Sequence, residues 1–142
     1  MDKWLDILGN IIGVVYETIY HPLRPDEYTD LSEYSSVLLD KIGDESEAEV
    51  YLPDEAMPLY KIEQVKSNRL LKRISKRRYV RISYNCDNFA ADAFAAGIGL
   101  VWIRRHALNF FIDTDLKLWF YEPQNRTLTE SVDDAIRFLL GR

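Results

Sequence analysis

The only cysteine of the chain, Cys86, is followed by a histidine, His106, and an acid, Glu122, all within 37 residues. Cys86 comes directly after Asn85, a residue type that caps helices, so we expect it in the first turn of a helix. Unpaired backbone N–H groups and the helix dipole favour a negative charge there, and the thiolate is the nucleophilic form of cysteine. A thiolate of this kind needs a base and a third group that orients the base. The three residues therefore predict a Cys–His–Glu centre.

Strand pairing is the reason to expect contact between His106 and Glu122. The pattern predicts a long strand over residues 100–112 and a partner strand over residues 116–121, joined by a turn at residues 113–115. A three-residue loop there pairs residues whose numbers sum to about 228, which places His106 directly opposite Glu122. Directly opposed residues share one face of the sheet, whereas a register change of one residue would separate them.

Each of these residues also has a structural interpretation. A lone cysteine beside alanine and phenylalanine is typical of a small core residue, and a strand histidine is often a satisfied polar group. Glu122 precedes Pro123 and could cap a loop, while the second histidine, His21, precedes a proline and is interpreted as structural. Spacing alone gives the catalytic and the structural interpretations equal weight.

Three short motifs surround the candidate residues, and they add a family resemblance. The motifs are Cys86-Asp87-Asn88-Phe89-Ala90, His106-Ala107-Leu108-Asn109 and Glu122-Pro123-Gln124. They resemble the papain-like C-terminal domain of the Marasmius oreades agglutinin and its microbial and phage relatives, where the motifs read approximately C-D-D-F-A, H-A-x-N and E-P-Q. The match covers about 40 residues, under a third of the chain.

This resemblance implies a papain-like fold and a cysteine-protease triad. The family pattern makes Cys86 the nucleophile, His106 the base and Glu122 the orienting acid. Asn109 and Gln124 match motif positions, and the resemblance implies supporting polar roles for them.

The resemblance also raises calcium as an implied cofactor, because the activity of the agglutinin depends on it. Asp87 is the candidate ligand, but Asn88 departs from the acid expected after it, which puts metal binding in doubt. Gln64 is a candidate for the glutamine that papain-type enzymes place at the oxyanion, and the backbone N–H of Cys86 could supply another donor. No sugar-binding repeat precedes the motifs, so lectin activity is not implied.

Further helices and strands must position these residues. Helices are expected over residues 26–42, 58–78 (broken near Ser67-Asn68), 86–96 and 131–140, with short strands over residues 48–52 and 79–83. Gly43 and Gly97 are predicted to end the helices that precede them.

Two segments suggest contact with partners. Residues 2–20 predict a helix so apolar that it must be buried, either in its own domain or in a homo-oligomer, and the Gly9-x-x-x-Gly13 spacing would permit close helix contact. Residues 61–81 hold nine of the 18 Lys and Arg residues and a single acid. A solvated face and a site for an anionic partner such as nucleic acid both fit this charge, and the lack of an interleaved aromatic platform favours the solvated face.

Composition limits the class of protein. The 142 residues are 47% hydrophobic and 29% charged, which suits a single domain over residues 1–142, with a mainly helical part over 1–78 and the Cys–His–Glu core over 79–142. The net charge of −5 argues against a general nucleic-acid binder. We see no signal peptide and no run of about 18 apolar residues, so we expect a cytoplasmic protein without a membrane span.

Together these observations predict an α+β, minimal papain-like domain. The expected function is that of a cysteine hydrolase, acting as a protease, amidase or acyl transferase on a peptide or protein substrate. The alternative is a non-catalytic module of the same fold, which would associate through residues 2–20 or bind an anionic partner through residues 61–81.

Overall fold

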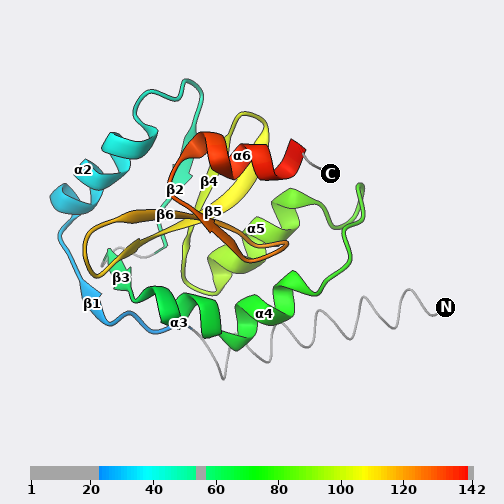
Figure 1. Ribbon diagram of the computed structural model, residues 1–142, viewed down its shortest axis with the longest axis horizontal. Coiled ribbons are helices and arrows are strands. Elements are labelled where there is room, and N and C mark those ends of the chain that lie inside the picture. The colour runs from blue at the N-terminus through cyan, green and yellow to red at the C-terminus, as the bar shows by residue number, and fades with distance from the viewer. Residues whose placement is uncertain (1–22, 54–56, 141–142) are drawn as a thin grey trace.

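The framework of the molecule is one seven-stranded, mostly antiparallel sheet (Figure 1), in a computed structural model that describes residues 23–53 and 57–140. The strands are β1 (Glu27–Tyr28), β2 (Glu49–Tyr51), β3 (Pro58–Tyr60), β4 (Gly99–Ile103), β5 (His106–Asp113), β6 (Leu118–Glu122) and β7 (Thr127–Thr129). The helices are α2 (Leu31–Ile42), α3 (Ile62–Ser67), α4 (Arg69–Ser75), α5 (Cys86–Ala95) and α6 (Val132–Leu140). This architecture confirms the predicted α+β class.

Strand β5 is the centre of the sheet. It pairs antiparallel with β4 on one side and with β6 on the other, and β3 runs parallel to its last residues. All eight residues of β5 are buried, as expected for a strand that is covered on both faces. His106 is therefore the first residue of a strand that is buried along its whole length.

Helices cover both faces of this sheet. On one face, Phe111 of β5 packs in a cluster with Phe89 of α5 and with residues of α3 and α4. On the other face, Phe110 packs with Tyr34 of α2 and Val132 of α6. Phe110 and Phe111 pack in different clusters because successive residues of a strand point to opposite faces of the sheet. The helix that carries Cys86 thus lies against β5, on the face opposite α2 and α6.

Helix α5 has the limits that the sequence predicts. It begins at Cys86 after the cap Asn85 and ends at Ala95, and Gly97 follows with a φ of 120°. A side chain at Gly97 would be strained at this φ, and its Cβ would lie 3.0 Å from the Tyr60 hydroxyl oxygen. The glycine therefore lets the chain turn from the helix toward β4.

The single long strand predicted over residues 100–112 is wrong. The chain instead forms a hairpin, in which β4 and β5 are joined by the two-residue turn Arg104–Arg105. Both turn residues have positive φ, 48° and 65°, which is the backbone of a tight hairpin turn usually marked by Asn-Gly. Two arginines are not typical of such a turn. The sequence pattern therefore predicts one continuous strand where the structure has two.

The N-terminal half also differs from its prediction. The helix expected over residues 26–42 starts only at Leu31, because Asp30 caps it by accepting a 2.8 Å hydrogen bond from the Glu33 N–H. Residues 27–28 form β1 instead, and residues 58–60, expected to be helical, form β3. The part expected to be mainly helical therefore supplies β1, β2 and β3 to the sheet.

Several smaller predictions are confirmed. The break near Asn68 separates α3 from α4, and the Asn68 side chain caps α4 by accepting from the Leu71 N–H at 2.9 Å. The expected strand over 48–52 is β2, and the helix expected over 131–140 is α6, whose Asp134 N–H donates to the Ser131 hydroxyl. Gly43 ends α2, in a right-handed rather than a left-handed conformation. The helix expected over residues 2–20, and His21, lie outside the described residues.

Candidate active site

The start of α5 is built to hold Cys86 in a fixed place. The Asn85 side chain accepts a hydrogen bond from the Asp87 N–H at 3.1 Å, and the Asn88 side chain accepts from the Asn85 N–H at 3.0 Å. This reciprocal capping satisfies backbone donors that a helix start leaves open. Cys86 is the first residue inside this cap and is half-buried. Its thiol therefore meets the positive end of the helix dipole.

His106 and Glu122 make the contact that the hairpin argument predicts. The ring nitrogen Nε2 of His106 lies 2.9 Å from Oε2 of Glu122, and both side chains are buried. The other carboxylate oxygen, Oε1, accepts from the Gln124 N–H at 3.2 Å. Glu122 is thus held on both oxygens, and it fixes the orientation of the imidazole through Nε2.

The pairing that brings them together differs by two residues from the predicted one. Asn109 pairs with Tyr121, so the residue numbers sum to 230 rather than 228, and Glu122 is a diagonal neighbour of His106 rather than its direct opposite. The loop does span three residues, 114–116, but it lies one residue later, because Asp113 still pairs with Lys117 through a 2.8 Å backbone hydrogen bond. A slip of two residues keeps every side chain on its predicted face.

The pKa values of Cys86 and His106 are shifted in opposite directions. A hydrogen bond with His106 lowers the pKa of the Cys86 thiol below its ordinary value; burial opposes this, and a backbone hydrogen bond with Ala107 assists it. Burial acts to lower the pKa of His106, yet hydrogen bonds with Cys86 and Glu122 raise it to about 9. Both shifts favour the charged form of their group, the thiolate of Cys86 and the imidazolium of His106. Since Nε2 bonds to Glu122, Nδ1 is the ring nitrogen left for the thiol.

Asn109 ties the cysteine helix to the sheet. It is fully buried, and its Nδ2 donates to the Ala90 carbonyl of α5 at 2.9 Å and to the Gly99 carbonyl of β4 at 3.0 Å. Its Oδ1 has no partner among the described residues. Asn109 therefore positions α5 relative to β5, and so Cys86 relative to His106, through side-chain hydrogen bonds to backbone carbonyls.

The remaining polar candidates have limited parts in this arrangement. Gln124 contributes its backbone N–H to Glu122. Gln64, the weak candidate for an oxyanion donor, uses its side-chain amide nitrogen to bond the Arg24 carbonyl. The structure therefore gives no support for an oxyanion role of Gln64, and the Cys86 N–H is the donor that the helix start offers.

The described side chains near Asp87 do not form a set of calcium ligands. The thiol of Cys86 lies 3.8 Å from the Asp87 carboxylate, and Asn88 is used in the helix cap. Within residues 23–53 and 57–140, no group of three or more His, Cys, Asp or Glu side chains could hold a metal ion. The described side chains thus do not fit a calcium site.

A set of contacts among Arg77, Tyr84 and Asp92 holds the chain that leads into α5, and the sequence did not predict it. The Arg77 guanidinium lies 3.8 Å from the centre of the Tyr84 ring and forms a 2.9 Å ion pair with Asp92. The Tyr84 hydroxyl donates to the same Asp92 carboxylate, and its ring packs against Phe89 at a centroid distance of 4.6 Å. These contacts fix the chain just before Asn85. Arg77 belongs to a run of basic residues, so nothing in the sequence distinguished it.

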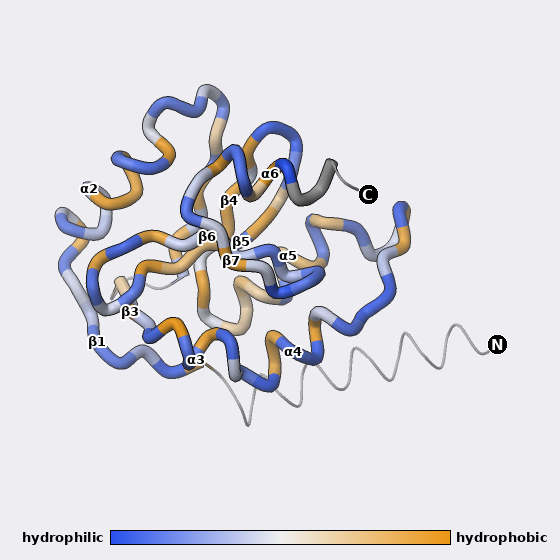
Figure 2. The backbone as a smooth tube through the Cα atoms, viewed as in Figure 1, coloured by the Kyte–Doolittle hydropathy of each residue, from blue (hydrophilic) through white to orange (hydrophobic). Residues whose placement is uncertain are grey.

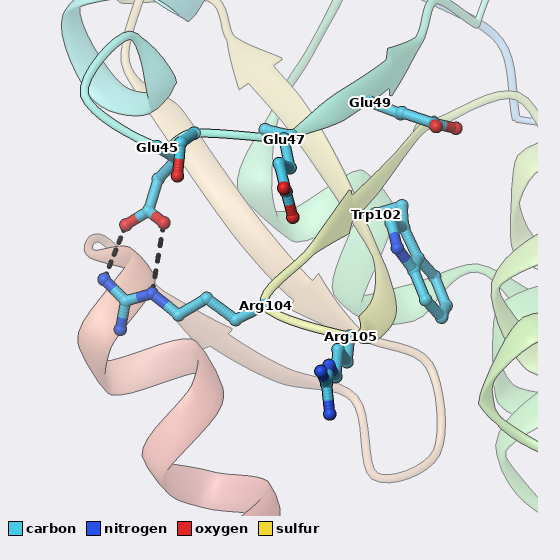
Figure 3. Close-up of a pocket in the computed structure, with 8 residues that line it drawn as sticks. Glu45, Glu47, Glu49, Trp102, Arg104 and Arg105 are labelled. Atoms are coloured by element: carbon cyan, nitrogen blue, oxygen red, sulfur yellow. Dashed lines mark hydrogen bonds and ion pairs between the residues drawn. The ribbon is translucent and has the colours of Figure 1, made fainter.

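A pocket opens beside the β4–β5 hairpin but does not contain the candidate triad (Figure 3). It is lined by Glu45, Ser46, Glu47, Ala48, Glu49, Trp102, Arg104 and Arg105. Arg104 is held there by a two-pronged ion pair with Glu45 and by Asp133. Trp102 pairs across the hairpin with Ala107, the residue after His106. The pocket and the candidate triad therefore share strands β4 and β5. The charged residues that line the pocket are not members of the triad.

The arrangement places a half-exposed thiol near an imidazole that lies 2.9 Å from a buried carboxylate. The thiol sits at a helix start, where backbone N–H groups can stabilise negative charge on the sulfur or on an oxygen of a bound substrate. The imidazole can accept the thiol proton and return it to another atom, since Glu122 stabilises its charged form. This is the chemistry of an activated cysteine nucleophile.

Comparison with known proteins supports the fold. No family model and no curated protein matches the sequence. Among solved structures, the PSL1a–E64 complex matches with a TM-score of 0.60 and 19% sequence identity. The match covers 75% of this chain and 48% of the PSL1a chain, so this chain spans about half the length of that protein. In the part of the chain that the structure describes, no helix is long and apolar enough to cross a membrane. The Cys86-bearing helix, packed on a mostly antiparallel sheet, thus matches a papain-like structure.

Proposed function

We propose that this chain is a papain-like cysteine hydrolase that cleaves a peptide or amide bond, or transfers its acyl group to an amine. The observation that carries the proposal is that Cys86 begins a helix packed on β5, where the His106 ring lies 2.9 Å from the Glu122 carboxylate. The lowered pKa of the thiol and the raised pKa of the imidazole agree with it. The likeness of the fold to the complex of PSL1a with E64, an inhibitor of papain, supports it. The motif resemblance to the agglutinin domain and its relatives belongs to the same proposal.

In the proposed reaction, Cys86 attacks as a thiolate and His106 carries the proton. The sulfur bonds to the carbonyl carbon, and the Cys86 N–H donates to the oxygen that becomes negative. His106 then gives its proton to the leaving amine as the C–N bond breaks, which leaves an acyl-thioester on Cys86. Water or a second amine, deprotonated by His106, releases the acyl group and regenerates the thiol. Glu122 holds the imidazole through both steps. A reducing compartment such as the cytoplasm would keep this single thiol free.

Thiol reactivity tests the proposal without knowledge of the substrate. Because the chain has one cysteine, the mass of the intact protein reports labelling of Cys86 alone. We expect rapid alkylation by iodoacetamide at about pH 6, where an ordinary thiol with a pKa of about 8.5 is almost wholly protonated. E64 should add to the same residue. Both reactions should be lost in Cys86→Ala and slowed in His106→Gln, which keeps a polar side chain but has no base.

Two results would contradict the proposal. The first is a pH dependence of alkylation that follows an ordinary thiol, which would mean that His106 does not activate Cys86. The second is turnover of a peptide substrate by Cys86→Ala at the rate of the parent chain.

A further inference from the structure

A short hairpin between α4 and α5 presents apolar side chains to solvent. Val80 and Tyr84 exchange both backbone hydrogen bonds, at 2.7 and 2.8 Å, and enclose residues 81–83 at the tip. The segment expected to be a strand over residues 79–83 is thus a tight turn, and Figure 1 shows it projecting from the body of the molecule beside α5. We call residues 79–84 the tip hairpin.

The base of the tip hairpin is held firmly. Tyr84 is fixed between Arg77 and Phe89, as described above, and the Asn85 side chain donates to the Arg81 carbonyl at 3.1 Å. The direction in which the tip points is therefore set by the same contacts that fix the start of α5. Its exposed side chains therefore project from a hydrogen-bonded turn whose base is fixed by packing.

The side chains of the tip combine apolar and basic groups. Ile82 at its end is 94% exposed, the highest value of the large apolar residues that are exposed in the described structure, and Tyr79 and Val80 are 47% and 42% exposed. Arg78 and Arg81 flank them and are exposed. Figure 2 shows hydrophobic and hydrophilic residues side by side along this projection. Residues 61–81 as a whole hold nine cations and one acid in a chain whose net charge is −5.

This chemistry points to a lipid surface. The tip is convex, so a partner must yield around Ile82, and the interface of a bilayer does so for apolar side chains flanked by cations. Tyrosine suits the headgroup level, and arginine pairs with lipid phosphate while its stem lies along apolar groups. We propose that the tip hairpin docks on anionic membranes, with Ile82 in the acyl boundary and with Arg78 and Arg81 at the headgroups. An acidic chain needs this local positive charge, because the rest of its surface is repelled by such a membrane.

Co-sedimentation of the full chain with lipid vesicles tests the proposal, independently of any hydrolase activity. The parent chain should bind mixed phosphatidylcholine–phosphatidylserine vesicles and bind phosphatidylcholine vesicles much more weakly. Ile82→Asp should weaken binding about ten- to hundredfold, because the isoleucine side chain would no longer be buried in the bilayer. Loss of one cation near the surface should weaken it about fivefold in Arg81→Ala. Both side chains are exposed, so the fold should be unchanged.

A matched control separates insertion of the tip from a general change in charge. Leu39 is 69% exposed on α2, and Leu39→Asp makes the same chemical change there. We expect Leu39→Asp to bind as the parent does. The proposal is overturned if the parent does not bind anionic vesicles. That is the result expected if the tip hairpin instead binds an acidic protein. It is also overturned if Ile82→Asp binds as the parent does, since another segment would then carry the contact.

Discussion

The contact between Glu122 and His106 gives a sharp prediction for Glu122→Gln. This substitution keeps the shape of the side chain and an oxygen that can accept from Nε2, but it removes the buried negative charge 2.9 Å from the ring. A hydrogen bond to a charged group contributes about 1.5–3 kcal/mol, and one pKa unit corresponds to about 1.4 kcal/mol. The pKa of His106, about 9 in the parent, should therefore fall by roughly one to two units.

Nuclear magnetic resonance titration of the imidazole signals measures this directly. The chain has two histidines, and His21→Gln removes one signal and so assigns the other to His106. Glu130→Gln is the matched control, because it makes the same charge change at an exposed carboxylate that pairs with Lys117. We expect the control to leave the His106 titration unchanged. The pH dependence of Cys86 alkylation should follow the same shift.

Two outcomes would refute this reasoning. If His106 of the parent titrates near the ordinary value of 6.5, its contacts with Cys86 and Glu122 are not those described. If Glu122→Gln leaves the pKa of His106 at about 9, the thiol alone raises it, and Glu122 does not stabilise the imidazolium.

Three further predictions concern stability, each measured as the free energy of unfolding in denaturant. Asn109→Leu should cost about 2–4 kcal/mol, because two buried carbonyls lose their donor, and its alkylation rate should fall as α5 shifts; an unchanged rate would argue against the positioning role. Gly97→Ala should cost about 1–3 kcal/mol because its φ is 120°, and a neutral result would mean that the turn can relax. The raised pKa of His106 stabilises the fold fully below about pH 6.5, and this contribution is lost as the pH rises through about 9. The parent should therefore lose more stability across that window than His106→Gln, by about 1–3 kcal/mol.

The start of α5 could be predicted because its signals are local. Asn85 before an alanine-rich stretch specifies a cap and a first turn within a few residues, and the glycine after the helix specifies its end. The shared face of His106 and Glu122 could be predicted for a similar reason. Alternation along two strands determines the face, and an error of two residues in the pairing leaves that face unchanged.

The parts that could not be predicted depend on unusual backbone or on distant partners. Arg104, Arg105 and Leu116 all adopt positive φ in turns, a conformation that their residue types do not signal. Strand β3 exists because its residues pair with the end of β5, more than 50 residues later in the chain. The short range of sequence patterns cannot reveal that pairing, so residues 58–60 resemble the start of the helix that follows them.

Glu122 lies two residues from the position directly opposite His106, and this diagonal placement has a consequence for how the chain could diverge. A shift of the pairing between β5 and β6 by a single residue would turn Glu122 away from the face of His106. A change of two residues would preserve the face and alter only the reach between the side chains. Variants that keep the contact between the histidine and the glutamate should therefore keep this register or shift it by an even number of residues. A shift by an odd number should coincide with a compensating bulge or with loss of the acid.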